Sequence, residues 1–139
     1  MTKSAPTTPR RLAGWLLAAA TAGYTGVLLF MTHHPRPHAL IGPHAPSDKT
    51  LHVWAYGVLA LLAAATLAAW GRWRPRPVAG LAGGLAAFGV FDELTQPLPW
   101  FRRTSDPVDW LYDCVGIGLG LALIAAGVAV ARMAPRATR

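Results

Sequence analysis

Acidic residues and cysteine are scarce in this sequence. Charged residues make up only 14% of its 139 residues, six of them acidic, whereas an average soluble domain carries about 25% charged residues. Hydrophobic residues make up 53%, so we expect lipid to form part of the surroundings of the chain. The single cysteine, Cys114, excludes an intrachain disulfide and indicates no redox compartment.

Several motifs of soluble enzymes are also missing. The chain has no GxSxG nucleophile motif, no P-loop and no glycine fingerprint of a dinucleotide-binding fold. An enzyme of this sequence would therefore depend on carboxylates or on a metal ion. Cys114 has no base at helical spacing on its own segment, so we interpret it as a core residue.

The net charge of +7 would suit a nucleic-acid partner, but its distribution does not. The basic residues lie in short clusters between long apolar runs, which is the pattern that membrane topology produces. We therefore exclude nucleic acid as a partner.

Four apolar runs predict the fold. They cover residues 12–31, 51–70, 78–91 and 110–131, and about 20 apolar residues are needed to cross a membrane as a helix. The sequence predicts an all-α membrane protein, a bundle of four transmembrane helices spanning 12–131. A polar tail, 1–11, precedes this domain and a basic tail, 132–139, follows it. The first run is longer than the apolar region of a usual signal peptide, which favours a retained helix.

Lysine and arginine predict the orientation. Nine of them fall in the two tails and the second loop, and four fall in the first and third loops. The positive-inside rule then places both termini in the cytoplasm. All six acidic residues map to the opposite, outer ends of the helices.

Two of these carboxylates are expected inside the membrane. Pro75 and Pro77 place the start of the third helix near Val78, and the helix can continue to Gln96, which puts Asp92 about one turn below the outer interface. The fourth helix is expected to open at Asp106-Pro107, so Asp113 lies nearly two turns inside. Carboxylates at such depth are costly and rarely face lipid, so they should face the bundle interior.

Helical spacing gathers polar side chains into stripes. The candidate site residues on these stripes are Asp48, His52 and Tyr56; Asp92 and Gln96; and Asp106, Asp109 and Asp113. Lys49, Arg102 and Arg103 can supply cations. Two GxxxG spacings, Gly80/Gly84 and Gly116/Gly120, favour close helix approach, although the motif is common in apolar helices.

Structural roles compete with functional ones at several positions. Asp106 is best interpreted as the N-cap of the fourth helix, and Asp48 can equally cap the second. Glu93 points about 100° away from Asp92 and can pair with an arginine or face the headgroups. Lys49 can be a simple loop charge.

The first loop is rich in histidine and proline. Its histidines, His33, His34, His38 and His44, have irregular spacing and no cysteine between them. Metal binding is therefore the weaker hypothesis for this loop, and we expect it to be solvated.

The segments DKTLHVWAY and FDELTQPLPWFRRTSDPVDWLYDCVG together resemble the VanZ-like membrane proteins. That family pairs D-K-x-x-H-x-x-x-Y with D-E-x-x-Q, an arginine and D-x-x-x-N-x-x-G. The matching positions here are Asp48, Lys49, His52, Tyr56, Asp92, Glu93, Gln96, Arg103, Asp109 and Gly116. The chain departs from the pattern at Asp113, where asparagine is usual, and its double arginine leaves the matching arginine ambiguous.

The resemblance implies a cell-envelope protein of the bacterial inner membrane, and its namesake is linked to low-level resistance to teicoplanin. Three hypotheses stay open. The polar residues at the outer ends of the helices can bind a membrane lipid, a cell-wall precursor or a glycopeptide antibiotic. It can belong to an enzyme acting on a lipid-linked substrate, with a histidine base or a divalent metal. It can also be a structural network of ion pairs. No cofactor, catalytic residue or oligomeric state follows from the sequence.

Overall fold

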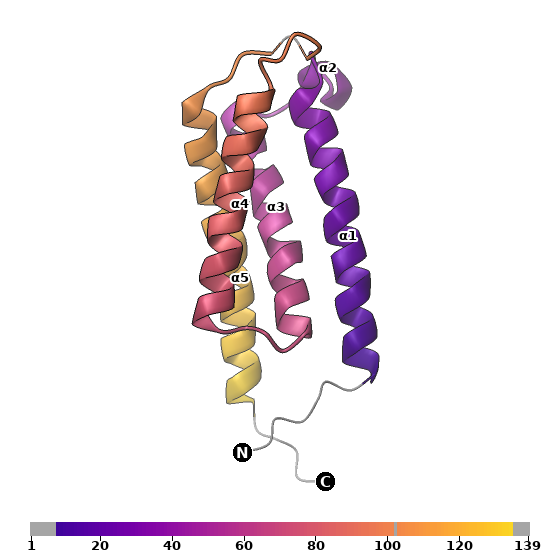
Figure 1. Ribbon diagram of the computed structural model, residues 1–139, viewed down its shortest axis with the longest axis vertical. Coiled ribbons are helices and arrows are strands. Elements are labelled where there is room, and N and C mark those ends of the chain that lie inside the picture. The colour runs from indigo at the N-terminus through magenta and orange to yellow at the C-terminus, as the bar shows by residue number, and fades with distance from the viewer. Residues whose placement is uncertain (1–7, 102, 135–139) are drawn as a thin grey trace.

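The computed structural model describes residues 8–101 and 103–134 (Figure 1). This part of the chain forms five helices and no strand: α1 (Thr8–His33), α2 (Pro37–Ile41), α3 (Asp48–Ala69), α4 (Pro75–Thr95) and α5 (Pro107–Met133). All except α2 are long and apolar enough to cross a membrane. The prediction of an all-α bundle with four membrane-spanning helices is confirmed, and the chain is an integral membrane protein.

The helices extend beyond the apolar runs at several ends. α1 begins at Thr8 and α5 ends at Met133, so residues predicted as tails continue these two helices. α4 begins at Pro75 rather than near Val78, with proline at its first position, where no backbone N–H is needed. It ends at Thr95, just before the prolines at 97 and 99. The first loop, which was expected to be solvated, contains the short helix α2, none of whose residues is buried.

Two caps fix the first turns of α5 and α3, the helices that carry most of the candidate site residues. Asp106 Oδ1 accepts a 2.9 Å hydrogen bond from the backbone N–H of Val108, as predicted for the N-cap of α5. At α3, however, the cap is Ser47, whose Oγ accepts from the N–H of Thr50 at 3.3 Å. Asp48 is the first helical residue, so its carboxylate is free for contacts outside the helix.

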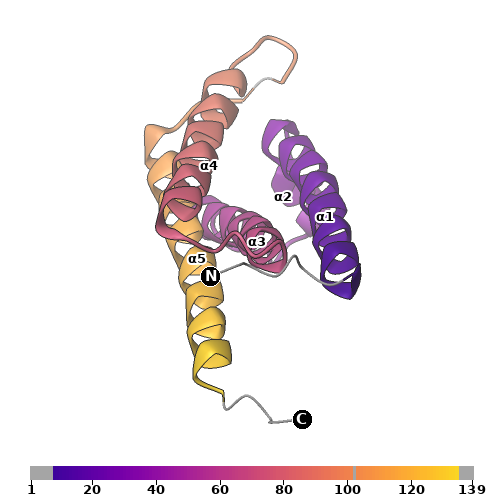
Figure 2. The ribbon, with the colours of Figure 1, turned by 60° about the horizontal axis from the view of Figure 1, so that its bottom comes forward.

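α3 lies at the centre of the bundle, between α5 and α1 (Figures 1 and 2). Its contact with α5 is very close at Gly116, where an added Cβ would lie 2.8 Å from Gly57 N and collide with the carbonyl of Val53. Gly120 meets the same helix at Ala60. The GxxxG at Gly116/Gly120 is thus a true helix contact, because glycine removes the side chain that would separate the two backbones.

The other GxxxG has no such role in the described chain. A Cβ at Gly80 or at Gly84 would meet nothing within 4 Å, so these glycines face outward from the bundle.

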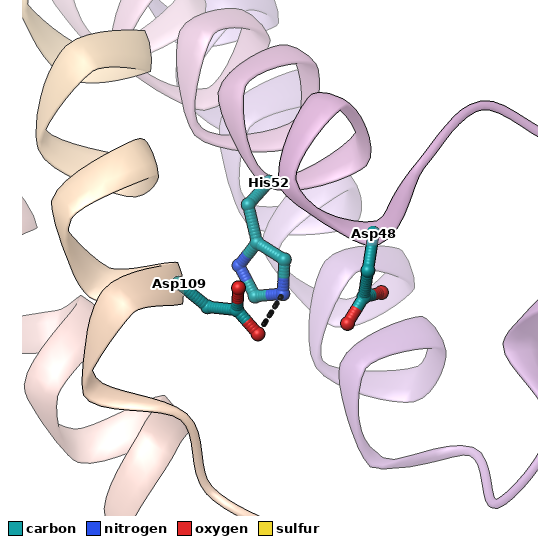
Figure 3. Close-up of side chains that lie close together, drawn as sticks. All are labelled: Asp48, His52 and Asp109. Atoms are coloured by element: carbon teal, nitrogen blue, oxygen red, sulfur yellow. Dashed lines mark ion pairs between the residues drawn. The ribbon is translucent and has the colours of Figure 1, made fainter.

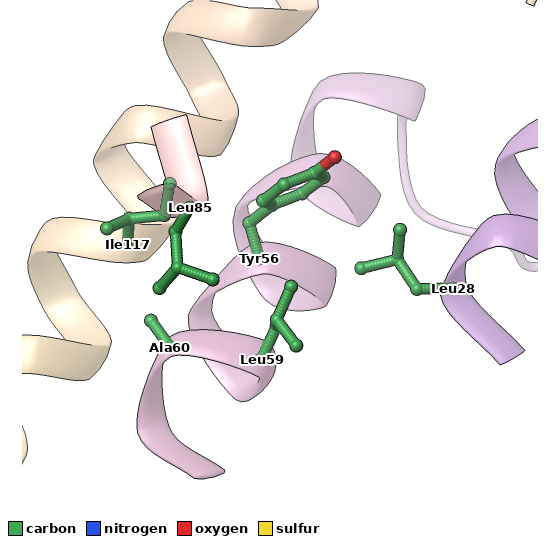
Figure 4. Packing of buried hydrophobic residues seen from close by; sticks show 6 residues of the cluster. All are labelled: Leu28, Tyr56, Leu59, Ala60, Leu85 and Ile117. Atoms are coloured by element: carbon green, nitrogen blue, oxygen red, sulfur yellow. The ribbon is translucent and has the colours of Figure 1, made fainter. Parts of the chain in front are cut away.

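The apolar core is small (Figure 4). It joins all four long helices through Leu28, Tyr56, Leu59, Ala60, Leu85 and Ile117. Many large apolar side chains point outward instead, among them Phe30, Leu119 and Leu123, each more than half exposed. An apolar exterior around a small core is what a chain solvated by lipid requires.

Candidate functional site

The candidate site lies at one end of the bundle, which we call the polar end: the end where α1 and α4 finish and α3 and α5 begin (Figure 1). The ten candidate residues for ligand binding are Asp48, Lys49, His52, Tyr56, Asp92, Glu93, Gln96, Arg103, Asp109 and Asp113. Seven of them are buried at this end: His52, Tyr56, Asp92, Glu93, Gln96, Asp109 and Asp113. Asp48, Lys49 and Arg103 lie at the rim. The expectation that the deep carboxylates face the bundle interior is confirmed, because Asp92 and Asp113 are both 0% exposed.

His52 occupies the middle of this cluster. Its Nδ1 lies 2.8 Å from Asp113 Oδ1, and its Nε2 lies 3.8 Å from Asp109 Oδ2. With Asp113 ionised, its carboxylate can only accept, so Nδ1 carries the proton and donates it to Asp113. Figure 3 shows the ring between the carboxylates of Asp109 and Asp48, with its Nε2 edge directed toward them. The i, i+4 spacing of Asp109 and Asp113 on α5 lets both reach one imidazole.

Asp113 has one oxygen with a partner and one without. Oδ1 bonds to His52, whereas Oδ2 is buried and accepts no hydrogen bond within the described ranges. An added Cβ at Gly89 of α4 would lie 3.2 Å from this oxygen, so glycine leaves room for the carboxylate between α3, α4 and α5. A buried oxygen without a donor is costly.

Asp92 forms a second centre that joins α1 to the cluster. Its Oδ1 accepts from Thr32 Oγ1 at 2.8 Å and lies 3.4 Å from His33 Nδ1, and its Oδ2 accepts from Tyr56 Oη at 3.1 Å. His33 also contacts Thr95 Oγ1 through Nε2, at 2.9 Å. The prediction of a solvated loop histidine is wrong for His33, because α1 continues through it and turns its ring inward.

Glu93 differs from expectation in its partners. It is buried rather than facing headgroups, and no arginine in the described chain pairs with it. Its Oε1 accepts from Gln96 Nε2 at 3.0 Å, and its Oε2 accepts from Ser105 Oγ and from the backbone N–H of Asp106. Gln96 therefore joins Glu93 rather than the Asp92 stripe. The glutamate ties the loop before α5 to the end of α4.

Three cationic contacts surround the rim. Lys49 Nζ lies 3.4 Å from both Asp106 Oδ2 and Asp109 Oδ1, and Arg103 Nη2 lies 3.5 Å from Asp48 Oδ2. The backbone N–H that Asp106 caps, together with Lys49, holds the pKa of the Asp106 carboxyl below its usual value. Lys49 is thus more than a loop charge. Arg102, the other arginine of the pair, lies outside the described residues.

A cavity of about 240 Å³ opens beside the cluster, between α1 and α3. Its apolar lining includes Tyr24, Val27, Leu28, Leu51, Trp54 and Val58. Its polar lining includes Thr32 as well as the charged or ionisable residues Asp48, His52 and Arg103. We call this cavity the α1–α3 groove. It places an apolar wall and a charged end in one continuous space.

The donor atoms also permit metal binding. Two groups offer one ligand atom per residue, all within 4.8 Å of one another: Asp48, His52 and Asp109, and His52, Glu93 and Asp113. Cys114 is only half-buried and belongs to neither group.

Comparisons of this chain with protein-family models, with curated protein sequences and with solved structures found no match. The VanZ-like resemblance rests on the spacing of the motif residues alone.

Proposed function

We propose that this chain is a VanZ-like cell-envelope protein that binds an amphiphilic or lipid-linked ligand at its polar end. The polar end would face outward from the bacterial inner membrane, with both termini in the cytoplasm. The distribution of lysine and arginine supports this orientation. The ligand class includes membrane lipids, cell-wall precursors and glycopeptide antibiotics, all of which join a polar head to an apolar part.

The observation that carries the proposal is the α1–α3 groove. Apolar side chains such as Val27 and Trp54 line it, and Asp48, His52 and Arg103 give it a polar end. An acyl or prenyl chain lying along α1 would place its headgroup beside these three residues. Arg103 can donate two hydrogen bonds to a phosphate, while Asp48 can accept from an ammonium or hydroxyl group.

Lipid binding to the purified protein tests the proposal. Native mass spectrometry would measure retention of polyprenyl phosphate and of phosphatidylglycerol by the wild type and by two tryptophan variants. Val27→Trp fills the groove, whereas Val115→Trp places the same bulk on the outer face of α5. We expect stoichiometric retention by wild type and Val115→Trp, and loss in Val27→Trp. Equal retention by both variants would place the lipid elsewhere.

A second candidate function is a membrane enzyme acting on a lipid-linked substrate. The contact that favours it is the one between His52 Nδ1 and Asp113 Oδ1, because a carboxylate holding one ring nitrogen leaves the other to act as a general base. Nε2 lies on the side of the ring that faces Asp109 and Asp48 (Figure 3). Turnover of polyprenyl phosphate or phosphatidylglycerol that is lost in His52→Ala would support catalysis, whereas binding without turnover would leave a binding protein.

Teicoplanin susceptibility tests the envelope role separately. Cells expressing wild type, His52→Ala or Asp109→Asn at equal membrane levels would be compared for survival and for surface binding of labelled antibiotic. Protection by wild type alone would link the cluster to resistance. Absence of protection by wild type would remove the resistance role and leave lipid binding to be judged by its own assay.

A further inference from the structure

One ring nitrogen of the cluster, His52 Nε2, has no hydrogen-bond partner among the described residues. His52 is 5% exposed, and its Nδ1 is bound to Asp113. Its Nε2 makes no hydrogen bond within the described chain and lies 3.8 Å from Asp109 Oδ2, beyond hydrogen-bond distance. Figure 3 shows this nitrogen directed toward the carboxylates of Asp109 and Asp48. A ring nitrogen of a buried histidine that faces two acids favours a proton or a cation between them.

The three side chains have the donor set of a metal site. Asp48, His52 and Asp109 offer one nitrogen and two oxygens within 4.8 Å of one another. Zinc–ligand distances of about 2.0–2.2 Å place neighbouring ligand atoms about 3–4 Å apart, so movements of less than about an ångström would close the set. Imidazole with carboxylates suits Zn²⁺ or Mn²⁺ rather than a soft ion.

The surroundings of His52 favour ligation through Nε2. Histidines that bind metals usually donate their other ring N–H to a carboxylate, which fixes the ring and its tautomer. Asp113 Oδ1 occupies that position at 2.8 Å from Nδ1. The alternative group, His52 with Glu93 and Asp113, would have to break this bond. It also uses Glu93, whose two oxygens already accept three hydrogen bonds.

The excess of buried acidic residues in the cluster also favours a bound cation. Asp92, Glu93 and Asp113 are buried, and none forms an ion pair with a lysine or arginine in the ranges 8–101 and 103–134. Lys49 reaches Asp109 Oδ1 instead, which leaves Oδ2 on the His52 side. Arg103 Nη2 lies 3.5 Å from Asp48 Oδ2, and Asp48 Oδ1 lies 3.8 Å from His38 Nε2. Excess buried negative charge is costly, and a bound divalent cation would offset it.

We infer that Asp48, His52 and Asp109 bind a divalent cation, Zn²⁺ or Mn²⁺, at the polar end of the α1–α3 groove, with Asp113 as the positioning residue for His52. Asp48 and His52 both line the groove, so an open coordination position faces the space where a headgroup would lie. Three protein ligands with one open position is the arrangement of catalytic zinc sites. That the cation then contacts the headgroup rests on the proposed function, whereas binding of the cation does not.

Metal content of the full-length protein in detergent tests the inference without any lipid. The protein would be stripped with a chelator, dialysed against Zn²⁺ or Mn²⁺ and analysed by elemental mass spectrometry, with Mn²⁺ paramagnetic resonance as a second readout. His52→Gln and Asp109→Asn remove one ligand each. Asp92→Asn is the matched control, since it neutralises a buried acid of the same cluster outside the ligand set.

We expect one equivalent in wild type and in Asp92→Asn, with a modestly lower affinity in Asp92→Asn because one buried negative charge is removed, and none in the two ligand variants. Asp113→Asn should weaken affinity by about 10–100-fold, the usual effect of losing a carboxylate that orients a ligating histidine. Added Zn²⁺ should also raise the melting temperature of wild type and Asp92→Asn but not of His52→Gln. Melting curves thus separate a folded variant without metal from an unfolded one.

Two results would overturn the inference. One is folded wild-type protein that retains no metal after dialysis. The other is equal metal loss in Asp92→Asn and Asp109→Asn, which would indicate general attraction of cations to the acidic cluster. Either result leaves the lipid-retention assay with Val27→Trp unaffected, so failure of the metal site and failure of the proposed lipid site are read separately.

Discussion

Substitution of Gly116 by alanine tests whether the α3–α5 contact holds the polar cluster together. A Cβ at this position would lie 2.8 Å from Gly57 N and 3.1 Å from Val53 C, and would collide with the carbonyl oxygen of Val53. All three are backbone atoms, so no side-chain rotation relieves the overlap. The two helices would have to separate by about 1 Å to restore ordinary contact with that oxygen.

The expected loss of stability follows from that overlap. Overpacking of a tight contact costs about 1–3 kcal/mol, and the better helix propensity of alanine returns at most about 1 kcal/mol. Gly118 on the same helix is the matched control, because a Cβ there would meet nothing within 4 Å. Gly118→Ala should be neutral or slightly stabilising.

Unfolding of the purified protein by dodecyl sulfate in mixed micelles measures both variants. We expect Gly116→Ala to lose about 1–3 kcal/mol of unfolding free energy relative to Gly118→Ala. The separation should also weaken the contact between His52 on α3 and Asp113 on α5. Equal stability of the two alanine variants would refute the close approach of these helices.

Three further predictions concern single contacts of the cluster. Tyr56→Phe removes a buried donor to Asp92 and should cost about 1–3 kcal/mol in the same unfolding assay; an unchanged stability would contradict the 3.1 Å contact. A double-mutant cycle of His52→Ala and Asp113→Asn should give a coupling of about 0.5–3 kcal/mol, and additive losses would show that the two side chains do not interact. The pKa of Asp106 is lower in the folded protein than in the unfolded chain, so its ionised carboxylate stabilises the fold. This stabilisation is complete above the unfolded pKa of about 3.9 and is lost as pH falls through the lower folded pKa. The melting-temperature difference between wild type and Asp106→Asn should therefore be constant near neutral pH and shrink below pH of about 4; a difference that persists at acid pH would contradict a charge effect.

Much of the fold was predictable because membrane solvation imposes simple rules. Apolar run lengths predicted four spanning helices, and prolines together with Asp106 predicted how α4 ends and α5 begins. The exact ends were less predictable. Helices continue into polar sequence wherever their backbone hydrogen bonds can be completed, as at Thr8 and Met133, and hydropathy does not report this.

The candidate site was predictable where its residues share a helix face. Spacing placed Asp109 and Asp113 on one face of α5, and both now contact His52. Spacing along one helix does not predict which residues of another helix will contact its polar side chains. Thr32 and His33 join Asp92 because α1 packs beside α3 and approaches α4, a tertiary arrangement with no local signal.

Glu93 illustrates a second limit. Its angular separation from Asp92 suggested a headgroup-facing or arginine-paired side chain. Instead the α4–α5 loop folds back, so that Ser105 and the backbone N–H of Asp106 donate to Glu93. Loop geometry decided the outcome, and the loop sequence carries no periodic pattern from which to infer it.

The proposed function requires an amphiphile in the α1–α3 groove, with its head at Asp48, His52 and Arg103. The most direct measurement is a crystal structure grown from a lipidic mesophase containing polyprenyl phosphate. We predict density for the apolar chain along Val27 and Trp54, and a phosphate within ion-pair distance of Arg103. A groove closed by α1, or lipid density only on the outer face of α5, would contradict the claim.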